Sequence, residues 1–211
     1  MIRPLGRDAA APAAPADNDR LGGTAGNELL TSATGALLTV LLIAEAATIV
    51  WLGNLRTEHM FIGMALVPPV LLKLASTGYR FVRYYAGTRS YREKGPPLLA
   101  LRLLAPVLVA TTLLVLATGV WLLVIGHRSD LVLQLHKIGF IVWGVCFGVH
   151  VLWYLPRAWT SMRAHRTAAR AERAPASGLR GALLGASVGG GLALALALLS
   201  AIQAWHGRGG G

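Results

Sequence analysis

The sequence has few charged residues for its length. Of its 211 residues, only 14% are Asp, Glu, Lys or Arg, whereas 55% are hydrophobic. Soluble domains carry about 25% charged residues, so this composition excludes a soluble enzyme with a large polar surface. Two stretches almost free of charge, 29–53 and 98–126, indicate a protein that lies mostly in a membrane.

Cysteine is also nearly absent. The single Cys146 excludes an internal disulfide framework, a four-cysteine zinc site and a cysteine-ligated iron–sulfur cluster within one chain. Any metal bound by this chain therefore depends on histidine.

Acidic residues are scarce too, with 9 Asp and Glu against 20 Lys and Arg and a formal net charge of +11. A basic protein can bind nucleic acid, but no recognised binding motif accompanies this charge, and most of the basic residues flank apolar segments. We expect no nucleic-acid partner.

Five apolar segments are long enough to cross a bilayer, for which about 20 residues are needed. We therefore predict an all-α fold, an integral membrane helix bundle of five transmembrane helices. The segments are 30–53, 59–79, 99–126, 131–154 and 181–204. Gly181, Gly185 and Gly189 give the last segment a smooth face that another helix could approach closely.

The remaining residues form tails and connections. Residues 1–27 are rich in Ala, Pro and Gly and are expected to be a disordered tail rather than a cleavable signal peptide. Residues 28–154 form the first four helices of the bundle, 155–180 a basic connection, and 205–211 a second tail.

The basic residues predict the orientation in the membrane, because Lys and Arg prefer cytoplasmic connections. They gather in the first tail, after the second segment and after the fourth. The groups are Arg3, Arg7 and Arg20; Arg80, Arg83, Arg89, Arg92 and Lys94; and Arg157, Arg163, Arg166, Arg170, Arg173 and Arg180. The N-terminus is thus predicted to be cytoplasmic and the C-terminus external, in a multi-pass protein of the cell membrane.

Three of the six histidines lie within or at the edge of predicted spans, where an imidazole is costly and marks a candidate functional site. These are His59, His136 and His150. The other three are explained as surface or interface residues: His127, His165 and His206.

His136 and His150 are fourteen positions apart, which places them within about 40° on one helix face and about 21 Å apart along its axis. Gly139 lies near this stripe, where a flat ligand could approach the backbone. Phe140, Trp143 and Phe147 form an apolar wall beside it.

His59 opens the second segment, which runs in the same direction as the fourth. His59 and His136 therefore lie at matched depth near the outer leaflet and could be the two axial ligands of one haem iron. Fourteen positions after His59 comes Lys73, which would face His150. Pro68 and Pro69 interrupt the hydrogen bonding of the segment between His59 and Lys73.

This pattern resembles the haem-b membrane cytochromes, the cytochrome b/b6 and cytochrome b561-like four-helix bundles. In those families, two histidines separated by about thirteen residues, on each of two helices, hold two stacked b haems. His136 and His150 match one such helix, and His59 matches the outer half of the other. The resemblance covers residues 30–154 and implies one or two haem b groups in a four-helix core.

Four further residues are candidates for roles near such a cofactor. Glu45 is either a protonated, hydrogen-bonded carboxyl or part of a proton relay. Lys73 either extends to the headgroups or contacts an inner haem, a propionate or a quinone. Arg56 and Arg128 lie where outer haem propionates would emerge.

The expected function is that of an electron-transfer subunit rather than a self-contained enzyme. A b-type cytochrome would pass electrons between a quinone or another donor and a partner oxidoreductase subunit. Two alternatives stay open: a haem-free structural or assembly subunit, and a small proton-coupled transporter that uses Glu45 and Lys73.

Overall fold

The computed structural model describes residues 22–93, 95, 99–168 and 177–208. These ranges are helical throughout apart from short connections, and no strand occurs in them, which confirms the predicted all-α fold. The helices are α1 (Gly23–Val50), α2 (Arg56–Tyr85), α3 (Arg89–Glu93), α4 (Leu99–Ile125), α5 (Asp130–Ala168), α6 (Ser177–Ala197) and α7 (Leu199–Arg208).

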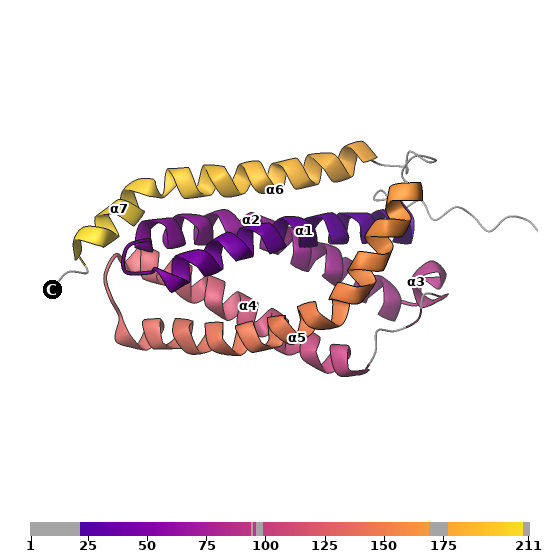
Figure 1. Ribbon diagram of the computed structural model, residues 1–211, viewed down its shortest axis with the longest axis horizontal. Coiled ribbons are helices and arrows are strands. Elements are labelled where there is room, and N and C mark those ends of the chain that lie inside the picture. Colours follow the sequence, from indigo (N-terminus) through magenta and orange to yellow (C-terminus); the bar gives the residue numbers. More distant parts are fainter. Residues whose placement is uncertain (1–21, 94, 96–98, 169–176, 209–211) are drawn as a thin grey trace, which may run out of the picture.

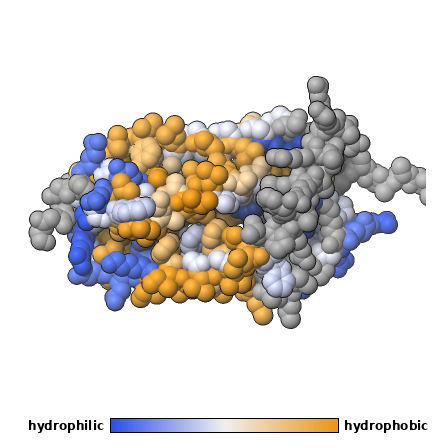
Figure 2. Space-filling view, in the orientation of Figure 1, coloured by the Kyte–Doolittle hydropathy of each residue, from blue (hydrophilic) through white to orange (hydrophobic). Residues whose placement is uncertain are grey.

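Five of the described helices contain stretches long and apolar enough to cross a membrane. The stretches are Gly23–Val50, Arg56–Tyr85, Arg102–Ile125, Asp130–Trp153 and Gly178–Ala197. Figure 2 shows the corresponding surface, with a hydrophobic band between hydrophilic ends. The chain thus has the features of a multi-pass membrane protein.

The long helices form two antiparallel pairs and one added helix (Figure 1). α1 packs on α2, α4 packs on α5, and α6 lies along α2 on the side away from α4 and α5. In the described ranges, the backbone of α5 makes close contact with α4 alone. The two pairs are therefore joined through α2 and α4, which share a core that includes Leu66 and Leu116.

The start of α1 differs from the sequence expectation. The predicted tail was to reach residue 27, but the helix begins at Gly23, while residues 1–21 lie outside the described ranges. The reason is a tertiary contact: Asn27 is buried, and its Nδ2 donates a hydrogen bond to the carbonyl oxygen of Ser76 on α2 at 3.2 Å. Arg80 and Glu28 form an ion pair at 3.3 Å one turn further along.

The basic connection predicted at 155–180 is largely helical where it is described. α5 continues to Ala168, and α6 begins at Ser177. At the other end of α5, the connection from α4 is short because Gly126 adopts a φ of 68°, the left-handed conformation that commonly ends helices.

The fifth span was predicted as one helix over 181–204, and the structure divides it at Leu198 into α6 and α7. The break lets α7 turn across the end of the bundle, where Ile202 is completely buried beside Met64 of α2 and Leu123 of α4. There the indole nitrogen of Trp205 donates a hydrogen bond to the carbonyl oxygen of Leu122 at 2.7 Å. That carbonyl is in the last turn of α4, where no helical donor follows.

The two prolines of α2 create a site for close helix packing. Because Pro69 has no N–H, the carbonyl of Ala65 loses its helical donor. A Cβ on Gly191 of α6 would collide with this same carbonyl oxygen, so the Cα–H of Gly191 points at it. Such a Cα–H···O contact partly satisfies the carbonyl and explains the close approach of α6.

The predicted glycine face of the last span is not the face that packs within the chain. A Cβ on Gly181, Gly185 or Gly189 would meet no atom within 4 Å. Packing on α2 instead uses Gly191 and the neighbouring Gly190, which approaches the ring of Pro68.

We predict that Gly191→Ala destabilises the protein by about 1–3 kcal/mol, the usual cost of overpacking, because the added methyl group collides with backbone rather than with a movable side chain. Gly185→Ala is the matched control, since it adds the same methyl group to the same helix in open space. Reversible unfolding in mixed micelles measures the free energy of unfolding of both variants. Equal stability of the two variants would show that α6 does not depend on this contact.

Candidate functional site

A partly buried polar cluster joins α1 and α2 near the end of the bundle where α7 lies. Nδ1 of His59 is 2.8 Å from Oε1 of Glu45, and it is 3.3 Å from Oγ1 of Thr48. Thr48 is buried and donates its hydroxyl hydrogen to the carbonyl oxygen of Glu45 at 2.6 Å. Its oxygen is thereby left as an acceptor for the imidazole.

A similar contact joins α4 and α5 at the same end. Nδ1 of His136 is 3.0 Å from Oγ1 of Thr118. The Thr118 hydroxyl already donates to the carbonyl oxygen of Leu114 at 2.7 Å. Since a hydroxyl has one hydrogen, Thr118 acts as the acceptor for His136.

These partners assign the same tautomer to both histidines. An ionised Glu45 accepts a hydrogen bond, and the Thr118 hydroxyl is an acceptor here, so with Glu45 ionised Nδ1 carries the hydrogen in His59 as it does in His136. Nδ1 is the ring atom in the contacts with Glu45, Thr48 and Thr118, and His136 also interacts with the backbone of Val115. Each Nε2 therefore presents a lone pair, which is the form of histidine that ligates a metal.

The two rings lie in an edge-to-face arrangement between the helix pairs. Their centroids are 6.4 Å apart and their planes are at 80°. An imidazole nitrogen binds a transition metal at about 2 Å and lies about 1.2 Å from its ring centre, so two axial imidazoles on one iron have centroids about 6.4 Å apart. The observed separation matches this value, although the α2 and α5 backbones do not touch.

Two glycines make room for these side chains. A Cβ on Gly119 of α4 would lie 3.3 Å from Cε1 of His136, and one on Gly63 of α2 would lie 3.6 Å from Oε1 of Glu45. The four long helices α1, α2, α4 and α5 thus all contribute to one site, through a carboxyl group, two imidazoles and two hydroxyls.

The site has too few ligands to hold a bare metal ion in a closed protein cage. Among the described residues, no group of three or more His, Cys, Asp or Glu side chains is placed to bind one. Two opposed imidazoles suit instead a cofactor that brings its own equatorial nitrogens, as a haem does. The residues present fit that group.

The predicted residues around the pair lie in different settings. Arg56 is the first residue of α2, one turn before His59. Arg128 is exposed and pairs with Asp130 at 2.7 Å. Gly139 is buried against α4, where a Cβ would lie 3.1 Å from Leu114, so its lack of a side chain serves helix packing.

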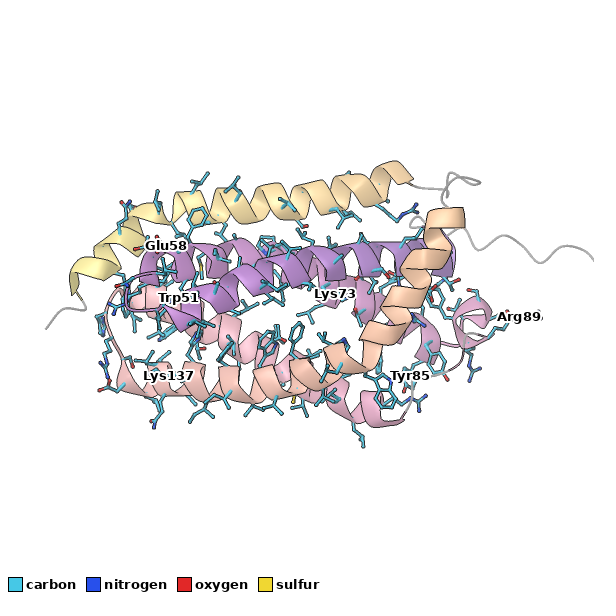
Figure 3. All side chains as sticks on the ribbon, viewed as in Figure 1. Trp51, Glu58, Lys73, Tyr85, Arg89 and Lys137 are labelled. Carbon is cyan, nitrogen blue, oxygen red and sulfur yellow. The ribbon has the colours of Figure 1, made fainter. Side chains whose placement is uncertain are left out.

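Lys73 lies within the length of the bundle, away from the end marked by Tyr85 and Arg89 (Figure 3). Its Nζ donates a hydrogen bond to the carbonyl oxygen of Thr31 on α1 at 2.7 Å, and Gly35 leaves space for it. The amine is therefore engaged by α1. It is also close enough to His150 for the two to interact electrostatically.

The predicted aromatic wall on α5 is a continuous stack. Trp143 is nearly parallel to Phe147, with ring centroids 4.7 Å apart, and it stacks on Phe140 at 5.9 Å. Its indole nitrogen donates to Oγ1 of Thr112 on α4 at 3.0 Å, which fixes the ring. The stack fills the interval between His136 and His150.

His127 lies outside the pair. His127 is exposed, with Nδ1 2.9 Å from the carbonyl oxygen of Ile125. The side chains of His165 and His206 lie outside the described residues.

No protein-family model, no curated protein sequence and no solved structure matches this chain. The functional argument therefore depends on the geometry of the site.

Sequence analysis did not identify the residues that contact the two histidines and Glu45. Thr48 could have been found, because it lies three positions after Glu45 and so on the same helix face. Thr118, Gly63 and Gly119 gave no such signal, because their importance depends on which helices are neighbours.

We predict that Glu45 and His59 are energetically coupled by about 1 kcal/mol in the haem-free protein, the usual size of an interhelical hydrogen bond in a membrane. A double-mutant cycle with Glu45→Ala and His59→Ala, followed by reversible unfolding, measures the coupling. The exposed Arg128 and Asp130 pair is the control and should show no measurable coupling. A Glu45–His59 coupling no larger than the control would contradict the ion pair.

Proposed function

We propose that this protein is a membrane-embedded b-type cytochrome that carries electrons, with His59 and His136 as axial ligands of one haem b. The observation that carries the proposal is the opposed imidazole pair at 6.4 Å, with Nδ1 of each ring hydrogen-bonded and Nε2 left for iron. Covalent haem attachment needs a pair of cysteines in sequence, and the chain has one cysteine. A haem held here would therefore be bound without covalent attachment, as haem b is.

The haem supplies one-electron redox chemistry, and the protein orients and tunes it. Toward a bound haem, Glu45 would orient His59 through its contact with Nδ1. The Thr118 hydroxyl orients His136 without adding charge. The two histidines thus differ in the group that orients them, a carboxyl for His59 and a hydroxyl for His136.

The contacts of Lys73 in the inner part of the bundle support one haem rather than two. The amine of Lys73 is engaged by the carbonyl oxygen of Thr31, which supports a structural role opposite His150 rather than iron ligation. The same interaction is the observation that favours the second candidate function, a haem-free structural or assembly subunit held together by interhelical hydrogen bonds.

Electrons would enter from a quinone or another donor and leave to a partner oxidoreductase subunit. The described connections at the end near the histidine pair are short, 51–55 between α1 and α2 and 126–129 between α4 and α5. Substrate chemistry is thus assigned to another subunit. We place the protein in the cell membrane with its N-terminus cytoplasmic and its C-terminus external, as the positive charges favour.

We predict that the purified protein binds about one haem b and has the visible spectrum of low-spin, bis-histidine iron. His59→Ala and His136→Ala should each abolish that spectrum, because either change removes an axial ligand. Reduced-minus-oxidised spectra and a pyridine haemochrome assay measure the ligation and the haem content. A colourless wild-type protein, prepared with haem available, would favour the haem-free subunit.

Two control variants accompany this experiment. His127→Ala removes an exposed histidine at the same end of the bundle and should leave the spectrum unchanged. His150→Ala should also retain the haem, whereas loss of half the haem content in this variant would establish a second, inner haem.

The orientation gives a separate prediction. With Cys146 changed to Ser, a cysteine at Gly207 should react with an impermeant thiol reagent added outside intact cells, and one at Arg89 should react only after lysis. The reverse pattern would place the histidine pair near the cytoplasmic leaflet.

A further inference from the structure

The four-helix resemblance assigns no role to the last span, yet this span contacts α2, which carries His59, and α4, on which the helix of His136 packs. His59 is on α2, and His136 is on α5, which packs on α4 alone in the described ranges. The distance between the two imidazoles is thus set by whatever fixes α2 relative to α4. The direct packing of α2 on α4 is much less extensive than the packing within either helix pair.

α7 contacts both of these helices. Ile202 and Ala195 are completely buried in one cluster with Met64 of α2 and Leu123 of α4. Trp205 adds a directional link, since its indole nitrogen donates to the carbonyl oxygen of Leu122 on α4 at 2.7 Å.

α6 attaches the last span to α2. Gly191 lies against the carbonyl oxygen of Ala65, a contact possible only for glycine. Ala65 and Met64 are adjacent on α2, so the last span is attached to α2 along α6 and then crosses to α4 through α7. It acts as a brace, a term we use for residues 191–205.

We propose that this brace sets the spacing of the haem ligands and that Trp205 is a positioning residue for the pair His59 and His136. The inference rests on the proposed function for its spectroscopic readout, although the spacing itself can be measured without haem. Trp205 touches neither histidine and acts by holding α4, and with it α5, at a fixed distance from α2.

The test compares Trp205→Phe, which keeps an aromatic ring but loses the N–H donor, with Trp51→Phe. Trp51 is exposed near the same end of the bundle and serves as the matched control. In the haem-loaded full chain, carbon monoxide binds only where one axial ligand has left the iron. Trp205→Phe should raise the fraction that binds carbon monoxide about fivefold at unchanged haem content, as expected for loss of one hydrogen bond.

A second readout uses the haem-free protein. Spin labels at Leu71→Cys on α2 and Ile141→Cys on α5, with Cys146→Ser, report the distance between the two helices at exposed positions. Trp205→Phe should broaden or shift this distance distribution, and Trp51→Phe should leave it as in the wild type. If Trp205→Phe fails to fold, the milder Ile202→Val, which trims the same cluster, takes its place.

The two readouts separate the two proposals. An altered distance distribution in a protein that binds no haem would support the brace and overturn the cytochrome. A normal haem spectrum with unchanged distances and unchanged carbon monoxide binding in Trp205→Phe would overturn the brace and leave the cytochrome intact.

Discussion

Hydrocarbon offers no water to polar groups, so each polar group inside this bundle must find a partner within the protein. Among the described residues, most hydroxyl groups donate to a carbonyl of their own helix, whereas several other groups are bonded between helices. The imidazole of His59 binds a carboxylate on α1, the amine of Lys73 binds a carbonyl on α1, and the indole of Trp205 binds a carbonyl on α4. Because each of these bonds joins two helices, the bond that gives a polar group its partner also fixes the position of a helix.

The prolines of α2 extend this principle to the backbone. Pro69 leaves a carbonyl without its donor in the middle of a span, which is costly in a membrane. The approach of Gly191 to that carbonyl turns a local defect into the attachment point of another helix. A residue that weakens one helix thereby specifies the packing of a second.

The sequence predicts the parts of this fold that depend on one segment at a time. Apolar length indicates the five spans, and the direction of each span places His59 and His136 at one depth. It does not predict the helix neighbours, so Thr118 could not be recognised as the partner of His136. The break at Leu198 was missed for the same reason, because it follows from burial of Ile202 against two distant helices.

The order of the elements along the chain has a consequence for biosynthesis. Domains and segments nearer the N-terminus are made first, and here the ligand-bearing helices α2 and α5 precede the brace of residues 191–205. A nascent chain can insert two helical hairpins while its last span is still within the ribosome. On the proposal above, the spacing of the two imidazoles is completed only when residues 191–205 pack on α2 and α4, after both hairpins have been made.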